Sequence, residues 1–200
     1  FHGYNYLLAR ENLTDHLSTH ERKEKIRQRL LKIRAKKVVI ATGAIERPLI
    51  FSNNDRPGII LSSSIKKYID YYGVKTGENI SLFTNNDSAY ETAINLNQKG
   101  INIEAVIDNR EEVDSKLVKE TENNKIRVYK GYTVVDTSGY KKIKNISIMQ
   151  LSKDGQKAIG SKISINCDCL GISGGWTPAV HLFTQSGGKL KFRDEDQVFI

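Results

Sequence analysis

A turn of small residues, Ala41-Thr42-Gly43, is the first place where this sequence could contact a cofactor. It directly follows an apolar, β-branched run. Small residues at the end of a strand let the backbone approach a ligand closely, because bulk at that point would block the approach. Glu46 and Arg47 come next in the chain and are further candidates for a cofactor or interface contact. An ordinary strand end followed by a turn is the alternative interpretation.

A second turn of this kind, Gly174-Gly175-Trp176, follows another apolar run. Paired glycines again suit close backbone approach to a cofactor. The indole of Trp176 could stack on a ring system or shield it. The alternative is a glycine-rich turn beside a core tryptophan.

A third turn, residues 84–89, lies between an expected strand and an expected helix, where a Gly-x-Gly-x-x-Gly motif would bind a pyrophosphate. Thr84, Asn86 and Ala89 occupy the three glycine positions. Asn tolerates unusual backbone angles, so the turn can still form. The side chains would nevertheless crowd the phosphates, so we expect no normal NAD(P)H binding here. Asp108 stands where a ribose-binding acid would be, and a strand-end turn residue is the favoured interpretation.

Other chemistry is poorly supported by the sequence. Cys167 and Cys169 lie two apart on an expected strand and should face the same way as buried free thiols. A metal site would need more ligands, and His181 is the nearest candidate, so no metal is expected. No Ser-His-Asp, paired-carboxylate or HExxH pattern appears. We therefore predict no catalytic residue in this chain.

Composition narrows the function classes. The 200 residues are 38% hydrophobic and 27% charged. Such a mixture is typical of a globular chain. No run approaches the length needed to span a membrane, and two close cysteines do not make a secreted disulfide framework, so the reducing cytoplasm is the expected compartment. The formal charge of +8 suggests nucleic-acid binding as a hypothesis. The basic stretch at residues 22–37 alternates with apolar residues as a strand with one wet face would, and no nucleic-acid motif accompanies it.

The expected elements define an α/β fold. Strands are expected at residues 4–10, 29–34, 37–42, 79–84, 102–107, 126–129, 132–136, 143–151, 162–166 and 167–172, and helices at 62–72, 87–99, 113–123 and 179–184. Serines should cap the first of these helices. This order favours a Rossmann-like FAD/NAD(P)-binding fold, in which a smaller β-α-β plus meander domain interrupts a partial outer domain. Residues 1–58 and 167–200 should form the outer domain, and residues 59–166 the inserted lobe.

Both ends of the sequence look like cuts inside a folded region, because it begins without Met and stops in an apolar trio. We therefore expect an excised piece of a longer polypeptide, whose site could need residues from elsewhere.

Several strings resemble the alpha subunits of heterotetrameric sarcosine oxidases, in the same order along nearly the whole chain. They are residues 34–48 (RAKKVVIATGAIERP), 53–58 (NNDRPG), 84–90 (TNNDSAY), 174–183 (GGWTPAVHLF) and 185–190 (QSGGKL). The fourth string is the most specific. The glycine-free turn at residues 84–89 also resembles the corresponding turn of this family.

The resemblance implies a complex that oxidatively demethylates sarcosine to glycine, produces hydrogen peroxide, and releases formaldehyde or passes the one-carbon unit to tetrahydrofolate. It implies NAD in the outer domain of alpha, FAD in the beta subunit, FMN at the alpha–beta interface, and tetrahydrofolate in another part of alpha. The implied partners are the beta, gamma and delta subunits, without nucleic acid or membrane.

Carried over by position, the resemblance implies that the first turn, Ala41-Thr42-Gly43, lies against NAD, and that the second turn, Gly174-Gly175-Trp176, closes over the same crevice. Glu46 and Arg47 are less specific candidates. Two alternatives stay open: a subunit of a related amino-acid or opine dehydrogenase, and a non-catalytic assembly module.

Overall fold

The computed structural model describes residues 4–200, so Phe1, His2 and Gly3 lie outside it. The chain divides into two compact units. Unit 1 comprises the residues up to Ile45 together with Thr177–Ile200, and unit 2 comprises Glu46–Trp176. These limits differ from the expected ones at residues 58 and 167. The reason is that β11 (Cys169–Ser173) pairs with β4 (Ile59–Leu61) and β5 (Asn79–Thr84) inside unit 2.

Unit 2 is built on a parallel sheet of five strands in the order β4-β11-β5-β6-β7. β6 is Asn102–Asp108 and β7 is Arg127–Lys130. β5 carries Ile80, Leu82 and Phe83 and is buried from its second residue onward. This is expected for a strand covered on both faces. The parallel pairs bring the carboxyl ends of the strands to one edge, where ligands usually bind in such sheets.

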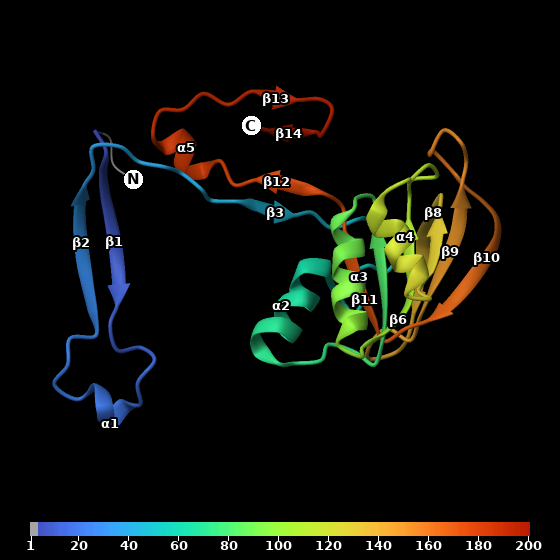
Figure 1. Cartoon of the computed structure of the whole chain (residues 1–200), viewed down its shortest axis with the longest axis horizontal. Helices are drawn as coiled ribbons and strands as arrows, with labels where there is room; N and C mark the ends of the chain where they lie inside the picture. The colour runs from blue at the N-terminus through green and yellow to red at the C-terminus, as the bar shows by residue number, and fades with distance from the viewer. Residues whose placement is uncertain (1–3) are drawn as a thin grey trace. The chain divides into compact units, whose positions relative to one another are not determined.

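Helices cover one face of this sheet and an antiparallel meander covers the other (Figure 1). The helices are α2 (Ser62–Tyr72), α3 (Ser88–Gln98) and α4 (Lys116–Asn123). The meander strands are β8 (Tyr132–Ser138), β9 (Asn145–Leu151) and β10 (Ala158–Asn166), in the order β10-β9-β8. Each layer has its own buried apolar cluster, so the sheet is the shared wall of two cores.

Local sequence explains where α2 begins and ends, with one correction. The helix stops at Gly73, whose φ of 64° is left-handed. That conformation suits glycine at a helix end. The expected serine cap is wrong, because Leu61 occupies the N-cap position without a side-chain hydrogen bond. The Glu46 carboxylate instead accepts from the backbone N–H of Ser63 at 2.9 Å. A buried acid from a distant segment thus satisfies a free donor of the helix start.

Unit 1 holds short elements. β1 (Tyr6–Asn12) and β2 (Gln28–Arg34) form an antiparallel hairpin around α1 (Thr19–Arg22), and the other elements are α5 (His181–Gln185), β13 (Phe192–Arg193) and β14 (Val198–Phe199). Leu30 and Ile33 of β2 are both exposed, so the expectation of a single wet face is wrong. No residue of β1 or β2 is buried.

The expected strand at residues 37–42 is also wrong. No described strand pairs with it, and Val39 is 89% exposed. An apolar run predicts a buried strand only if neighbouring strands supply hydrogen bonds on both sides, and residues 4–200 supply none there. The chain pairs slightly later instead, where β3 (Ala44–Glu46) and β12 (Trp176–Pro178) form a two-stranded sheet.

The two cysteines are buried and free, as predicted, but they face different cores. Cys169 packs in the helix-side cluster and Cys167 in the meander-side cluster. The bend at Asp168 separates them, so the strict alternation of a strand does not apply. Burial raises the pKa of Cys167 to about 12 and that of Cys169 to about 11.

These raised pKa values predict a loss of stability in alkali. An unfolded thiol ionises near its ordinary value of 9.0, whereas the folded chain keeps both thiols protonated. Above pH 9 the unfolded state therefore binds fewer protons, and the free energy of unfolding should fall as the pH rises toward 11–12. Urea denaturation at a series of pH values would measure this. A Cys167→Ala, Cys169→Ala double variant should lack that component of the pH dependence, and an unchanged profile would contradict the assignment.

Among residues 4–200, no helix is both long and apolar enough to cross a membrane.

Candidate functional site

The first predicted turn lines a cavity of about 360 Å³ in unit 1. Thr42 Oγ1 donates to the carbonyl of Ala179 at 2.6 Å, and the Ala179 N–H donates to the carbonyl of Gly43 at 2.9 Å. These bonds fix two segments, far apart in sequence, as one wall. The wall residues are Ile40, Ala41, Thr42, Gly43, Pro178, Ala179, Val180, Phe183 and Ile200.

Gly43 leaves space at this wall. Its φ is +69°, and no atom lies within 4 Å of the position that a Cβ would occupy. The glycine therefore supplies a left-handed turn and also leaves room beside the backbone. Both features suit the close approach of a flat, largely apolar group such as part of a dinucleotide.

The second predicted turn packs against protein backbone. The N–H of Gly174 donates to the carbonyl of Arg47 at 2.7 Å, and the N–H of Arg47 donates to the carbonyl of Gly175 at 2.8 Å. A Cβ on Gly174 would lie 2.8 Å from the carbonyl oxygen of Pro48. The φ of Gly175 is +96°. Both positions therefore favour glycine for a structural reason, which is the close packing against residues 47–48.

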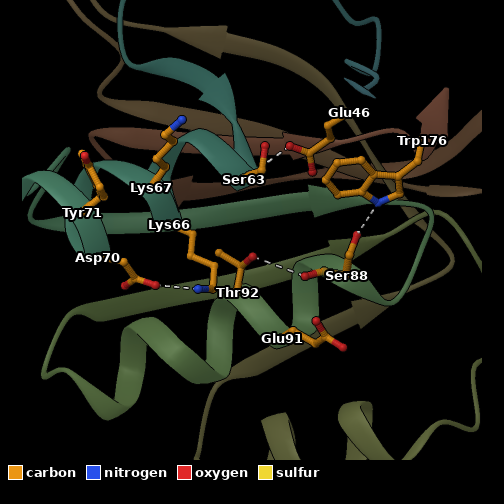
Figure 2. A pocket seen from close by; sticks show the side chains of 10 residues that line it. All are labelled: Glu46, Ser63, Lys66, Lys67, Asp70, Tyr71, Ser88, Glu91, Thr92 and Trp176. Carbon is orange, nitrogen blue, oxygen red and sulfur yellow. Dashed lines mark hydrogen bonds and ion pairs between the residues drawn. The ribbon is translucent and has the colours of Figure 1, made fainter. Parts of the chain in front are cut away.

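Trp176 is 39% exposed, so the alternative of a core tryptophan is wrong. Its indole Nε1–H donates to Ser88 Oγ at 3.0 Å. Ser88 begins α3, so the helix start holds the ring in one orientation (Figure 2).

Ser88→Ala should release the indole of Trp176. We expect a red-shifted emission and easier quenching by acrylamide, with a loss of about 0.5–1.5 kcal/mol in the free energy of unfolding from the lost hydrogen bond. Trp176 is the single tryptophan of the chain, so its fluorescence reports on this site alone. Ser64→Ala on α2 is a matched control that should leave the emission unchanged. Equal spectra for the two variants would contradict the role of Ser88.

The glycine-free turn is closed by its own side chains. Thr84 Oγ1 donates to the carbonyl of Ser173 at 3.1 Å, and Asn86 Nδ2 donates to the same carbonyl at 3.0 Å. Asn86 Oδ1 accepts from the N–H of Ser88 at 3.1 Å. The groups that would face a pyrophosphate in a glycine-rich turn are therefore engaged within the protein.

Asp108, at the end of β6, is also fully engaged. It has no exposed surface, and it accepts from Tyr90 OH at 2.9 Å and from the guanidinium of Arg110 at 2.8 Å. Arg110 also pairs with Asp87 at 2.8 Å. Asp108 is therefore a buried network residue at the strand end, and its carboxylate oxygens have partners inside the fold.

The network shifts two pKa values. Burial and the adjacent Asp108 carboxylate raise the pKa of the Tyr90 hydroxyl. Burial alone lowers the pKa of Arg110, but its hydrogen bonds and ion pairs with Asp108 and Asp87 outweigh burial and raise it. Tyr90 therefore stays a neutral donor and Arg110 a cation at ordinary pH.

The predicted site residues thus fall into three groups. Ala41, Thr42 and Gly43 share the unit 1 cavity, whereas Glu46 and Trp176 line a different cavity in unit 2. Arg47, Gly174 and Gly175 are joined through their backbones. Sequence reasoning missed Ala179, Ser88, Tyr90 and Arg110, whose contacts depend on long-range pairing. Within residues 4–200, no group of three or more His, Cys, Asp or Glu residues could hold a metal ion.

Comparison with known proteins gives relatives along nearly the whole chain. The chain is 37% identical over 198 residues to sarcosine oxidase subunit alpha of Corynebacterium sp. strain P-1, covering 98% of this chain and 20% of that protein. It is 34% identical over 173 residues to the subunit of the same name from Rhizobium meliloti strain 1021, covering 86% of this chain and 16% of that protein. No family model matches the chain. The chain spans about a fifth of the length of the curated relatives it matches.

Solved structures share the fold. A thioredoxin reductase of T. acidophilum superposes with a TM-score of 0.60 at 20% identity, over 84% of this chain and 53% of that chain. The L-proline dehydrogenase of P. horikoshii gives a TM-score of 0.57 at 24% identity, over 85% of this chain and 27% of that chain. The predicted Rossmann-like class and the predicted resemblance to sarcosine oxidase alpha subunits are both confirmed.

Proposed function

We propose that this chain, which is homologous to one segment of sarcosine oxidase alpha subunits, builds part of an NAD site in an oxidoreductase complex. The observation that carries this proposal is the wall made by Thr42, Gly43 and Ala179, which leaves open space beside the Gly43 backbone. Unit 1 is then the partial outer domain and unit 2 the inserted lobe.

In this proposal Ala41, Thr42 and Gly43 contact NAD directly. Their small side chains admit a flat ring or ribose close to the backbone. The described part of unit 1 carries no glycine-rich turn between a strand and a helix, so the pyrophosphate would be held by residues outside this chain. Glu46, Arg47, Gly174, Gly175 and Trp176 would act indirectly, through their hydrogen bonds within unit 2.

Unit 2 would not bind NAD(P)H at its own turn. The side chains of Thr84 and Asn86 donate hydrogen bonds to the carbonyl of Ser173. The Asp108 carboxylate accepts hydrogen bonds from Tyr90 and Arg110. A dinucleotide would have to displace bonds that the buried network already makes. The unit would serve as scaffold and for contacts with other subunits.

For the whole protein we propose the oxidative demethylation of sarcosine by O2 and water to glycine, formaldehyde and H2O2, or transfer of the one-carbon unit to tetrahydrofolate. FAD and FMN would act elsewhere in the complex, and the beta, gamma and delta subunits would be the partners. A cytoplasmic location agrees with two free, reduced cysteines.

The test is cofactor analysis of the complete subunit that contains this chain. Mass spectrometry of nucleotides released by denaturation should find NAD in stoichiometric amount, and a Gly43→Val variant should retain much less of it. The Cβ of that valine meets open space, although the positive φ strains it, so folding of the variant is checked by circular dichroism. Loss of NAD without loss of folding would support the site. A subunit that releases no NAD, or a Gly43→Val variant that keeps it all, would overturn the proposal. Oxidation of sarcosine against other secondary amines by the complex tests the substrate separately.

A further inference from the structure

A second cavity, of about 370 Å³, lies within unit 2 against α2 and α3 (Figure 2). Its walls are Glu46, Ser63, Lys66, Lys67, Asp70, Tyr71, Ser88, Glu91, Thr92 and Trp176. Figure 2 shows Glu46 and Trp176 close together at one end, and Lys67 and Tyr71 at the other. The NAD site proposed in unit 1 uses none of these side chains for contact.

One wall of this cavity is a fixed aromatic ring. Trp176 is partly exposed, and its Nε1–H is bound to Ser88 Oγ at 3.0 Å. Ser88 is itself bonded to Asn86, so the filled turn sets the position of the indole. A ring already held in place loses little conformational freedom when a ligand packs against it.

The charges around the cavity are uneven. Lys66 pairs with Asp70, which also binds Lys99, so this acid is neutralised within the protein. Glu46 is only 5% exposed, and its Oε2 accepts one hydrogen bond, from the N–H of Ser63. Glu91 adds a third carboxylate to the walls.

Lys67 is the remaining cation of the walls, and it lies toward Tyr71 in Figure 2. Among the lining residues, the end of the cavity beside Trp176 therefore carries the Glu46 carboxylate. An indole next to a buried carboxylate attracts an organic cation through both the ring quadrupole and the acid.

We propose that this cavity binds a small organic ammonium ion, with its methyl or methylene groups on the Trp176 ring and its charge beside Glu46. A ligand that also carries a carboxylate would direct that group toward Lys67. An N-methylated amino acid meets both requirements, and this narrower assignment rests on the proposed function, whereas the ammonium site does not.

Fluorescence of the single tryptophan tests the site in the 200-residue chain. Tetramethylammonium chloride and sarcosine should each change Trp176 emission with a saturable curve, whereas sodium chloride and sodium acetate should not. Glu46→Gln keeps an acceptor for the N–H of Ser63 but removes the charge, and it should weaken both affinities about tenfold, the equivalent of 1.4 kcal/mol. Glu112→Gln, at an exposed position outside the cavity, is the matched control and should bind as the parent does.

Glu91→Gln is the second variant, since Glu46→Gln could disturb the start of α2, and it should weaken tetramethylammonium binding to a smaller degree. Calorimetry provides a readout that does not depend on Trp176. The proposal is overturned if neither ammonium ion binds, if a folded Glu46→Gln variant binds as well as the parent, or if adenosine monophosphate binds instead. Tetramethylammonium binding by a chain whose complete complex does not oxidise sarcosine would refute the proposed function alone.

Discussion

Asp108→Ala is expected to lower the free energy of unfolding by about 3–5 kcal/mol, because it breaks a buried ion pair and leaves its partners unsatisfied. Asp108 is wholly buried, and its carboxylate is the acceptor for both Tyr90 and Arg110. Without it, the buried hydroxyl of Tyr90 loses its acceptor. The partly buried guanidinium of Arg110 then retains its ion pair with Asp87. Urea denaturation of parent and variant measures the difference.

Asp114→Ala is the control for this prediction. Asp114 pairs with Lys119 on the surface, where solvent screens the interaction, so little or no change is expected. Equal stability losses in the two variants would show that Asp108 has no special part in the fold. Its availability to a ribose would then have to be reconsidered.

Gly174→Ala should destabilise unit 2 by about 2–3 kcal/mol, since the new methyl group overlaps backbone atoms that cannot move aside easily. Its Cβ would lie 2.8 Å from the carbonyl oxygen of Pro48 and 3.0 Å from that of Arg47. The bond between Gly174 and Arg47 must then lengthen, and Trp176 should shift with it. Thermal or urea unfolding gives the energy, and Trp176 emission reports the local change.

Gly100→Ala separates this steric effect from ordinary glycine strain. Gly100 has a φ of +74°, and no atom lies near its Cβ position. Alanine there suffers only the left-handed backbone cost, which is about 1–2 kcal/mol. Its tryptophan emission should match the parent. A Gly174→Ala variant with parental stability and emission would mean that the close packing against residues 47–48 is not needed.

Local patterns predicted unit 2 well. The bounds of α2 and β5 match because a left-handed glycine, a helical apolar period and a short apolar run are all local signals. The closed turn at residues 84–89 could be expected too, because the absence of glycine is visible in the sequence and has a direct steric meaning.

Long-range partners could not be predicted in the same way. The run at residues 37–42 has a high β-strand propensity but no neighbouring strand among the described residues. A prediction from propensity alone was therefore wrong. Glu46 caps a helix that begins many residues later, and Cys167 and Cys169 separate because a bend interrupts their strand. Trp176 is not a core residue, because it lines a cavity and its indole is bound to Ser88.

Hydrogen exchange of the complete subunit, with and without NAD, tests most directly whether unit 1 contacts NAD and unit 2 does not. We predict that NAD protects backbone amides at residues 40–43 and 179–183 and leaves residues 84–90 and 108–110 unchanged. Protection of the second pair of segments, with none in the first, would contradict the account.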